Sequence, residues 1–310
     1  MLGNKLSEGN TIGIVAPSGP ENKENIMKNI ELLTSLGFKL KFGKNAFNRN
    51  GYLAGSDKDR VNDLMEMFID KTVDLIMCLR GGYGSSRLLP LIDWNIIKNN
   101  PKTFIGYSDI TVLLNEMYRR CNLITFHGPM LTSNLLEKRT LESLLSTLKN
   151  GFKPYCIDSY DSHIKSFSNS ITEGFLVGGN LSLICSSLGT DYEIDTINKI
   201  LFLEEIGEEP YKIDRMLTQL YNANKLQKCR GFILGHFTNC DTENREKSLS
   251  LNEVFKDKIL SLNRPTIFNF PSGHDYPNIT LPIGAKIRLN CVKCKIQVLE
   301  SVVKSGPLPL

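Results

Sequence analysis

The chain has 310 residues, a length that suits two domains sharing one site. Its 41% hydrophobic and 23% charged residues are typical of globular proteins and exclude a disordered chain. The net charge of +4 comes from scattered Lys and Arg, without the basic stripe of a nucleic-acid-binding protein. We therefore expect no nucleic-acid partner and only a mild preference for anionic ligands.

The sequence contains no run of about 20 apolar residues that would span a bilayer. Its first 20 residues also lack the long apolar stretch and small-residue cleavage positions of a secretion signal. Several of the eight cysteines lie in apolar runs such as 76–79, where a reduced thiol acts as a small hydrophobic group. Cys291 and Cys294 form a close pair, but a zinc site needs further ligands. We expect a cytoplasmic protein with no metal and no membrane contact.

The first half of the sequence alternates between strand and helix patterns. Strands are predicted at 11–16, 74–79 and 103–107, and amphipathic helices around 26–33, 61–68 and 110–117. Repeated strand–helix units of this length predict a parallel sheet with helices on both faces. Such sheets bind ligands beyond the carboxyl ends of their strands.

The second half follows a polar, irregular segment. We interpret residues 137–170 as a linker region between an N-terminal domain at 1–136 and a C-terminal domain at 171–310. Beyond the linker, strands are predicted at 171–177, 199–204, 230–237 and 265–270, helices from about 181 and across 213–220, and a turn at 178–180. The segments 286–290 and 295–301 are predicted to pair as an antiparallel hairpin.

Ser108 lies between a predicted strand and a predicted helix, in the sequence Gly106-Tyr107-Ser108-Asp109. A sharp turn there would expose the hydroxyl, and the first helical N–H groups would stabilise a developing oxyanion. The hydrolase elbow G-x-S-x-G is incomplete, because Ile110 replaces its second glycine. A catalytic nucleophile and an ordinary helix cap are both consistent with this pattern.

The loop Arg80–Gly84 also follows a predicted strand, and three of its residues are glycines. Glycines let the backbone approach a ligand closely and adopt positive φ. The spacing matches neither a phosphate-binding nor a dinucleotide-binding loop. A donor to an oxyanion and a plain tight turn both remain open.

The chain has four histidines. His274 lies in a polar turn after a predicted strand, where a loop residue reaches a binding cleft. His127 and His236 lie at strand ends and are consistent with packing, while His163 falls in the linker. The acidic run from Glu204 to Glu209 ends a strand, and by itself such a run is typical of a solvated loop.

Together these segments resemble one known family. The segments RGGYGSSRLL, GYSDIT, ITFHGPM, LEEIGEEPYKIDRMLTQLY and GH-x6-LP-x-G are similar to those of the LD-carboxypeptidases, serine peptidases of bacterial wall recycling. The resemblance runs from about Thr11 to the last strand. It implies that Ser108 is the nucleophile, Glu204 the acidic residue and His274 the general base.

The resemblance also implies the rest of the site. The backbone N–H groups of Gly82 and Asp109 would form the oxyanion hole. Apart from the resemblance, Arg80 and Arg87 flank the glycine loop, and a guanidinium fork suits a terminal carboxylate. We expect Arg80 to bind the substrate carboxylate and Arg87 to form a surface ion pair. Glu205 is the rival for the acidic role. Since strand side chains alternate, we expect it to point to the start of the helix at 213–220.

The fold class that the resemblance implies is α/β with two domains. The N-terminal domain would hold a flavodoxin-like parallel sheet and the smaller C-terminal domain a β/α barrel-like sheet, with the site in the cleft between them. The implied reaction releases D-alanine from muropeptide tetrapeptides, with a small peptide as substrate and no cofactor. The family is commonly dimeric, so we expect a homodimer.

Two alternatives remain open. A related branch confers microcin immunity by cleaving aminoacyl or peptidyl nucleotides, and it tends to carry Asn where this chain has Gly84. A non-enzymatic two-domain binding protein would explain the sheets and glycine turns. It would not explain Ser, Glu and His in three matching motifs.

Overall fold

The structure is a computed structural model that describes residues 1–157, 163–243 and 246–305. It divides into two compact units, which confirms a two-domain α/β architecture. The first unit contains Met1–Lys153, Ile279–Gly284 and the described part of Ser301–Leu310, and the second contains the described parts of Pro154–Asn278 and Ala285–Glu300. Within the described ranges, no helix is both long and apolar enough to cross a membrane.

These bounds differ from those expected from the sequence. Residues 138–150, assigned above to a linker, form helix α5 (Lys138–Asn150) in the first unit. Glu137 caps this helix by accepting from the backbone of Arg139 and Thr140, and its apolar stripe includes buried Leu148. The boundary therefore falls after Lys153, because the amphipathic helix packs before the polar segment begins.

The first unit is built on one sheet in the order β12-β5-β4-β3-β1-β2. Its strands are β1 (Thr11–Val15), β2 (Lys39–Phe42), β3 (Leu75–Cys78), β4 (Thr103–Gly106), β5 (Thr125–His127) and β12 (Leu281–Ile283). The first five are parallel, and β12 pairs antiparallel with β5. The order 2-1-3-4-5 is that of a flavodoxin-like sheet, as expected.

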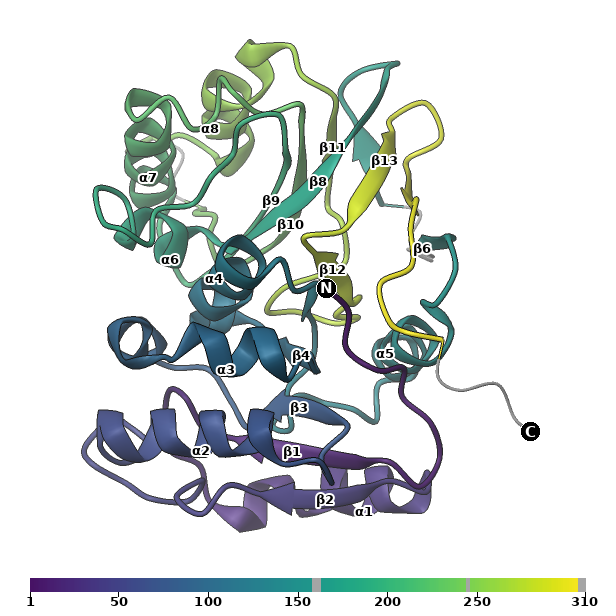
Figure 1. Cartoon of the computed structure of the whole chain (residues 1–310). Helices are drawn as coiled ribbons and strands as arrows, with labels where there is room; N and C mark the ends of the chain where they lie inside the picture. The colour runs from purple at the N-terminus through teal and green to yellow at the C-terminus, as the bar shows by residue number, and fades with distance from the viewer. Residues whose placement is uncertain (158–162, 244–245, 306–310) are drawn as a thin grey trace. The chain divides into compact units, whose positions relative to one another are not determined.

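Helices of the first unit pack along this sheet. They are α1 (Met27–Ser35), α2 (Asp57–Ile69), α3 (Trp94–Asn99), α4 (Thr111–Cys121) and α5. Figure 1 shows α2 near β1 and α4 near β4, in agreement with their contacts. Ser56 and Asp59 close a reciprocal capping box at the start of α2, which fixes the first turn of that helix.

The core of the first unit packs tightly around its central strands. The four-residue strands β3 and β4 are buried along their whole length. Phe104 of β4 stacks on Phe68 of α2, with ring centroids 6.2 Å apart. Burying each such side chain contributes about 1.5–3 kcal/mol. The loops that follow β3 and β4 therefore start from rigidly packed strands. They begin at the carboxyl edge of the sheet, where parallel sheets bind ligands.

The second unit contains a mixed sheet in the order β6-β14-β13-β8-β9-β10-β11-β7. Its strands are β6 (Tyr155–Ile157), β7 (Lys165–Ser166), β8 (Ile171–Asn180), β9 (Ile200–Ile206), β10 (Gly231–Thr238), β11 (Thr266–Phe268), β13 (Lys286–Asn290) and β14 (Lys295–Val298). Strands β8 to β11 are parallel, and the predicted hairpin of β13 and β14 is confirmed. The sheet expected to be barrel-like has β6 and β7 as edge strands in the described part of the chain.

Helices α6 (Leu181–Ser186), α7 (Pro210–Asn222) and α8 (Leu251–Lys258) lie together beside strands β8 to β10 in Figure 1. Pro210 stands in the first turn of α7, and Ser250 closes a capping box with Glu253 at the start of α8. Helix α7 follows directly on β9, so the strand and helix fix the turn between them.

The predicted turn at 178–180 is wrong, because these residues extend β8. Gly178 has a φ of 122°, and a Cβ at this position would come within 2.0 Å of the carbonyl oxygen of Phe202 in β9. The glycines thus allow two strand backbones to approach closely, a role that the sequence does not distinguish from a turn.

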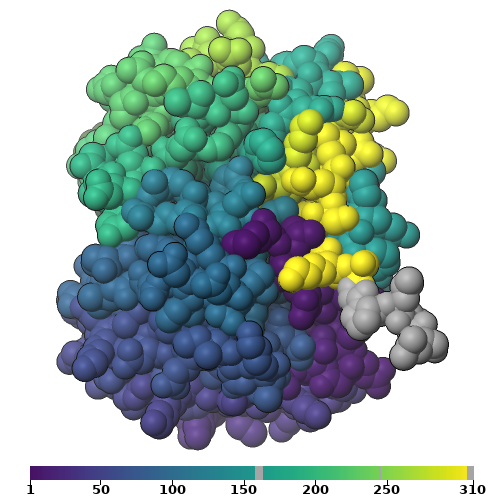
Figure 2. All heavy atoms as spheres, in the orientation of Figure 1, coloured from purple at the N-terminus to yellow at the C-terminus, as the bar shows by residue number. Residues whose placement is uncertain are grey.

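Two edge strands of the first sheet escape sequence reasoning. Strand β2 alternates Lys with apolar residues and is only half-buried, which is typical of a protected edge. Strand β12 has three residues and contains Pro282, which an edge strand tolerates. The chain ends add a further pairing, where Asn4 bridges Lys304; Figure 2 shows the N-terminal atoms beside this C-terminal segment.

Candidate active site

Ser108 lies at the carboxyl end of β4, in a 3-10 turn (Ser108–Ile110) that leads into α4. Its φ of 64° is in the left-handed region, which costs a non-glycine residue about 1–3 kcal/mol. Such conformations persist where the surroundings enforce them, and they occur at strained strand-to-helix turns that carry nucleophiles. The structure therefore departs from a serine N-cap, since the N-cap positions of the 3-10 turn and of α4 are Tyr107 and Ile110.

The glycine loop after β3 packs directly against Ser108. A Cβ on Gly81 would come within 2.9 Å of Ser108 Cβ and 3.0 Å of its Oγ, so a larger residue would displace the hydroxyl. Gly82 has a φ of 119°, and the Gly81 carbonyl accepts from the Gly19 amide at 3.1 Å. The loop is thus more than a tight turn, because its glycines bring three chain segments together.

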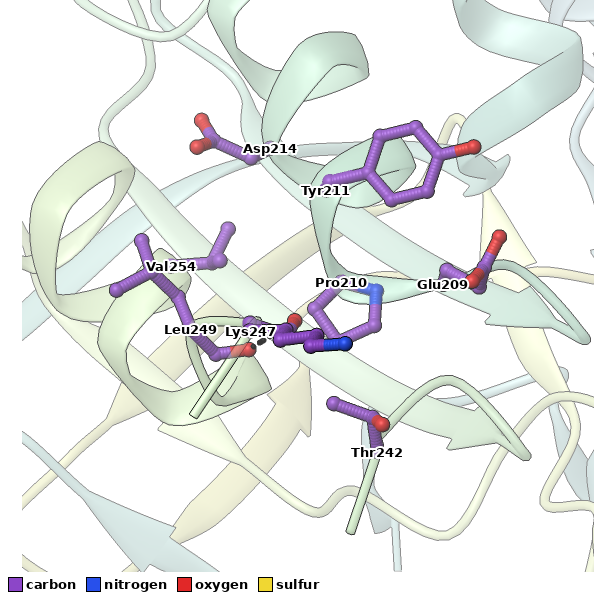
Figure 3. Close-up of a pocket in the computed structure, with 9 residues that line it drawn as sticks. Glu209, Pro210, Tyr211, Asp214, Thr242, Lys247, Leu249 and Val254 are labelled. Atoms are coloured by element: carbon purple, nitrogen blue, oxygen red, sulfur yellow. Dashed lines mark hydrogen bonds between the residues drawn. The ribbon is translucent and has the colours of Figure 1, made fainter. Parts of the chain in front are cut away.

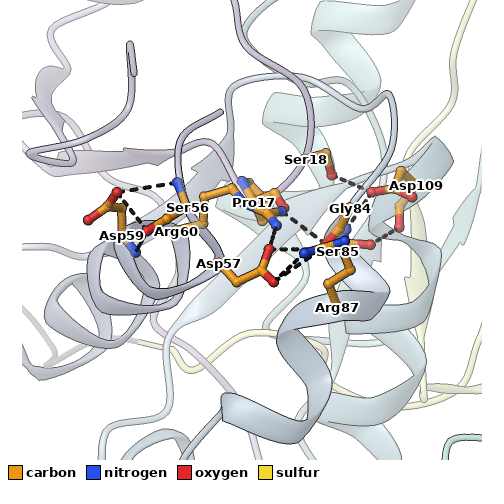
Figure 4. A network of polar contacts seen from close by, with 10 residues as sticks. All are labelled: Pro17, Ser18, Ser56, Asp57, Asp59, Arg60, Gly84, Ser85, Arg87 and Asp109. Atoms are coloured by element: carbon orange, nitrogen blue, oxygen red, sulfur yellow. Dashed lines mark hydrogen bonds and ion pairs between the residues drawn. The ribbon is translucent and has the colours of Figure 1, made fainter. Parts of the chain in front are cut away.

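Asp109, expected to act through its backbone, also has an engaged side chain. The carboxylate is buried, and its Oδ2 accepts from Ser18 Oγ at 2.5 Å and from the Ser85 amide at 2.8 Å. Ser85 Oγ donates in return to the Asp109 carbonyl oxygen. Figure 4 shows these contacts. Sequence reasoning assigned no role to Ser18, which lies in a turn without a functional pattern, or to Ser85, although Ser85 lies within RGGYGSSRLL.

The two arginines beside the glycine loop have different partners. Arg80, the expected carboxylate ligand, contacts Glu21 Oε2 at 3.2 Å, and its side chain is 40% exposed. Arg87 forms a fork with both carboxylate oxygens of Asp57 at 2.8–3.1 Å. Arg80 also donates to the carbonyl oxygens of Gly81 and Pro20 at 3.3 and 3.4 Å, so its guanidinium lies beside the glycine loop.

The second unit brings Glu204 and His274 together. Glu204 lies near the end of β9 and is fully buried, and His274 follows β11 in the chain. The Nδ1 of His274 and the Oε2 of Glu204 are 2.6 Å apart. Gly273 packs on this carboxylate, since a Cβ there would come within 2.9 Å of Glu204 Oε2. The carboxylate thereby fixes the Nδ1–H tautomer and leaves Nε2 as a proton acceptor.

The pKa of His274 is set by opposing effects. Burial alone would lower the pKa, but the hydrogen bond and negative charge of Glu204, with a smaller contribution from Glu205, raise it above the ordinary value of 6.5. The imidazolium is therefore stabilised in place. A histidine arranged in this way accepts a proton readily and holds it through a reaction.

Glu205 points to a different part of the second unit, consistent with alternation along β9. Its Oε1 accepts from Asn180 Nδ2 at 2.8 Å, and its Oε2 accepts from the Ser182 amide at 2.8 Å. The expected orientation toward the 213–220 helix is wrong, because Glu205 holds the start of α6 instead. It is consistent with the expected structural role, and Glu204 holds the histidine.

The other histidines and cysteines have structural surroundings. His127 is buried in β5, with its ring 5.8 Å from that of Tyr107, and His236 Nε2 lies 3.2 Å from the Pro277 carbonyl oxygen. All eight cysteines are free thiols, and burial together with the charge of Asp109 raises the pKa of Cys78 well above its usual range. Across residues 1–157, 163–243 and 246–305, no group of three His, Cys, Asp or Glu side chains is arranged to hold a metal ion.

A pocket of about 560 Å³ lies in the second unit at the start of α7 and α8. Figure 3 shows Tyr211 and Asp214 of α7 with Lys247 and Leu249 of the segment before α8. Its lining contains none of the site residues predicted from the sequence. The pocket follows β9 in the chain but involves different side chains from the Glu204–His274 pair.

Two family models match the chain. Residues 12–128 match the model of the LD-carboxypeptidase N-terminal domain, and residues 173–289 match that of the LD-carboxypeptidase C-terminal domain. These ranges include Ser108, Glu204 and His274.

Individual proteins are similar over nearly the whole length. A probable murein peptide carboxypeptidase of Bacillus subtilis (strain 168) is 41% identical over 98% of this chain and 95% of its own. The muramoyltetrapeptide carboxypeptidase from Oxalobacter formigenes has a TM-score of 0.83 at 29% identity, covering 93% of this chain and 97% of that one. The microcin C7 self-immunity protein MccF of Escherichia coli, solved with aspartyl sulfamoyl adenosine, has a TM-score of 0.87 at 28% identity, covering 98% and 100%.

Proposed function

Because the chain belongs to the LD-carboxypeptidase family, we propose that it is a serine carboxypeptidase that releases the terminal D-alanine from muropeptide tetrapeptides. Family membership makes the chain a peptidase, while the serine mechanism and the substrate are our proposal. The similarity to a murein peptide carboxypeptidase along 98% of the chain supports the substrate.

The Glu204–His274 pair is the observation that carries the mechanism. A serine hydroxyl needs a base to remove its proton, and that base needs a carboxylate to orient it. The 2.6 Å contact between His274 Nδ1 and Glu204 Oε2 meets the second requirement. We assign Ser108 as the nucleophile, Glu204 as the orienting carboxylate and His274 as the general base.

The proposed reaction is an acyl transfer in two stages, formation and hydrolysis of an acyl-enzyme. Ser108 Oγ attacks the carbonyl carbon of the LD amide bond while His274 Nε2 takes the hydroxyl proton. Collapse of the tetrahedral intermediate breaks the C–N bond, and His274 returns the proton to the amine of D-alanine. Water, deprotonated by His274, then attacks the ester carbon, and release of the tripeptide carboxylate restores the Ser108 hydroxyl.

The oxyanion of each intermediate requires preorganised donors. We assign the amides of Gly82 and Asp109, which flank the position of Ser108. Neither amide nitrogen donates a hydrogen bond to another group among the described residues, and Gly82 is exposed. The exposed Gly82 amide is therefore open to a substrate oxygen, while Asp109 is buried.

The terminal D-alanine carboxylate needs a cation, and we assign this role to Arg80. A guanidinium binds a carboxylate as a fork. The 40% exposed side chain of Arg80 reaches Glu21 by one nitrogen, and the guanidinium would turn from Glu21 to a substrate carboxylate.

The test is hydrolysis of defined substrates followed by mass spectrometry. A muropeptide tetrapeptide ending in D-alanine should lose that residue with the wild-type protein, whereas the same peptide ending in L-alanine should remain intact. An aminoacyl-sulfamoyl adenylate forms the second arm. Its cleavage without cleavage of the tetrapeptide would instead support the self-immunity reaction suggested by the similarity to MccF.

Two further measurements separate enzyme from binding protein. A fluorophosphonate should label the wild type and leave Ser108→Ala unlabelled. Activity should also survive EDTA, and complete loss that zinc restores would overturn the serine mechanism. Failure of both substrates and of labelling would indicate a protein that binds without catalysis.

A further inference from the structure

Three loops of the first unit meet at the carboxyl ends of neighbouring strands. Residues 16–19 follow β1, residues 79–85 follow β3 and residues 107–109 follow β4, and the sheet order places β3 between the other two. The loops carry Gly19, Gly82 and Ser108 respectively. The Gly19 amide donates to the Gly81 carbonyl oxygen, and side chains supply further connections between the loops.

Asp109 connects the loop after β4 to both other loops. Its Oδ2 accepts from Ser18 in the loop after β1 and from the Ser85 amide in the loop after β3. Ser85 Oγ donates back to the Asp109 carbonyl oxygen, so the two residues are bound reciprocally. Asp109 is only 1% exposed, and water does not compete for these bonds.

Arg60 connects the same loops from the helix side. Its guanidinium is 2% exposed and donates through Nη1 to the carbonyl oxygens of Pro17 and Gly84, the latter at 2.9 Å. Its Nη2 contacts Asp57, which also receives the fork of Arg87. Figure 4 shows this chain of contacts. Because this buried guanidinium donates to both carbonyl oxygens, it holds the backbone at Pro17 and at Gly84 in place.

The backbone of the glycine loop packs closely against the Arg60 guanidinium. Gly84 has a φ of 127°, and a Cβ there would come within 2.8 Å of Arg60 Nη1. The first turn of α2, which carries Arg60, is itself fixed by the capping box of Ser56 and Asp59. The guanidinium therefore approaches the loops from a rigid helix, and the contact is built into the fold.

We propose that the Asp109 carboxylate and the Arg60 guanidinium are positioning groups that hold Ser108 Oγ and the Gly82 amide in the geometry needed for acyl transfer. The inference rests on the proposed function, because it concerns the same nucleophile. The left-handed conformation of Ser108 persists only under restraint, and these two side chains supply it. A displacement of about 1 Å in a reacting group costs about 10²-fold in rate.

The alternative is that the network serves stability alone. Asp63 offers a matched control, because it is also buried and accepts from a backbone amide and a side chain, both of Asn45 at 2.8 Å. It lies in α2 but forms no hydrogen bond with the three loops among the described residues. Asp63→Ala should therefore lose stability without loss of positioning.

The experiment compares Asp109→Ala, Asp109→Asn, Ser18→Ala and Asp63→Ala in the full-length protein. The rate constant for fluorophosphonate labelling of Ser108 is measured at a temperature where each variant is folded, together with kcat and KM on the tetrapeptide. Asp109→Ala should label and turn over about 10²-fold more slowly, with KM within about threefold of wild type. Asp109→Asn keeps one acceptor oxygen and should recover about tenfold of the loss.

Ser18→Ala removes one hydrogen bond and should slow labelling about three- to tenfold, which keeps the test open if Asp109→Ala does not fold. Asp63→Ala should label at the wild-type rate despite a lower melting temperature. Wild-type labelling rates in both folded Asp109→Asn and Ser18→Ala would overturn the inference while leaving the proposed function intact. No labelling of the wild type would overturn both.

Discussion

The two halves of the proposed site are held in different ways. In the first unit, Ser108 lies among three loops joined by buried charges and reciprocal hydrogen bonds. In the second unit, a short contact joins His274 to a buried carboxylate near the end of a strand. Oxyanion donors must be fixed before the reaction, whereas a general base must change charge during it. The surroundings of Ser108 are thus suited to holding groups rigidly, and the surroundings of His274 are suited to its gain and loss of a proton.

Removing the nucleophile should have the largest effect. Ser108→Ala should lower kcat on the order of 10⁶-fold, which is the scale of loss when the serine of a peptidase triad is removed. The melting temperature should stay at or above that of the wild type, because alanine at this φ is no more strained than serine. Ser35→Ala, an exposed serine at the end of α1 in the same unit, is the control and should leave kcat unchanged. Residual activity above one per cent in Ser108→Ala would contradict the assignment.

Breaking the base half should cost about 10⁴-fold. Glu204→Gln removes the group that orients His274, whereas Glu205→Gln should keep most of kcat. Glu205→Gln should instead lower the unfolding free energy by about 1–3 kcal/mol, because the start of α6 loses a charged acceptor. Steady-state rates and chemical denaturation of both variants test this, and the reverse pattern would show that Glu205 is the orienting group.

A backbone change at the nucleophile should have an intermediate effect. In Gly81→Ala the new Cβ would press on Ser108, so we expect kcat to fall about 10²-fold with a smaller change in KM. Gly51→Ala is the control, because its φ of 61° strains an alanine but nothing lies within 4 Å of the Cβ. It should lose stability and keep its rate; equal rate losses in the two variants would refute a local effect at Ser108.

The pH dependence sharpens the comparison further. His274 must be neutral to accept a proton, so kcat/KM should fall toward acid with a midpoint above 6.5, the ordinary pKa. Glu205→Gln should move this midpoint down, since one charge that raises the pKa is lost. The pair's contribution to stability is complete below about pH 6.5 and declines as pH rises through the raised pKa. A midpoint below 6.5 in the wild type would count against this arrangement.

Arg80→Ala should give the smallest effect. We expect KM to rise several-fold with kcat nearly unchanged, since an exposed guanidinium contributes about 1–2 kcal/mol to carboxylate binding. Arg49→Ala is the matched control, because Arg49 also lies near Glu21 but off the glycine loop. An unchanged KM in Arg80→Ala would remove Arg80 from the site.

The sequence predicted the motifs at the ends of the strands better than the side-chain contacts that connect the loops there. Ser108, Glu204 and His274 each lie in a compact motif beside a predictable strand, and the family resemblance indicates them. Local pattern alone left Ser108 open and favoured a solvated loop for Glu204. The contact of Ser18 with Asp109 spans 91 residues and leaves no local signature. Arg60 lies on the buried face of an amphipathic helix, where a pattern of burial predicts an apolar residue.

Elements that depend on pairing rather than on composition were likewise missed. Strand β12 is three residues long and exists because β5 offers an edge, while the Gly-Gly-Asn segment is strand only because β9 lies close enough to need glycine. Such features follow from tertiary contact, which overrides local propensity.

The return of residues 279–284 to the first unit has a consequence for how the chain is made. Thr280 donates to Ser143, 137 residues earlier, and β12 covers the open edge of β5. During synthesis the first unit therefore emerges long before its last strand does, with an unpaired edge that invites association. A fragment ending at Lys153 would keep that exposed edge permanently, so the first unit cannot be expressed as a continuous piece with its sheet complete.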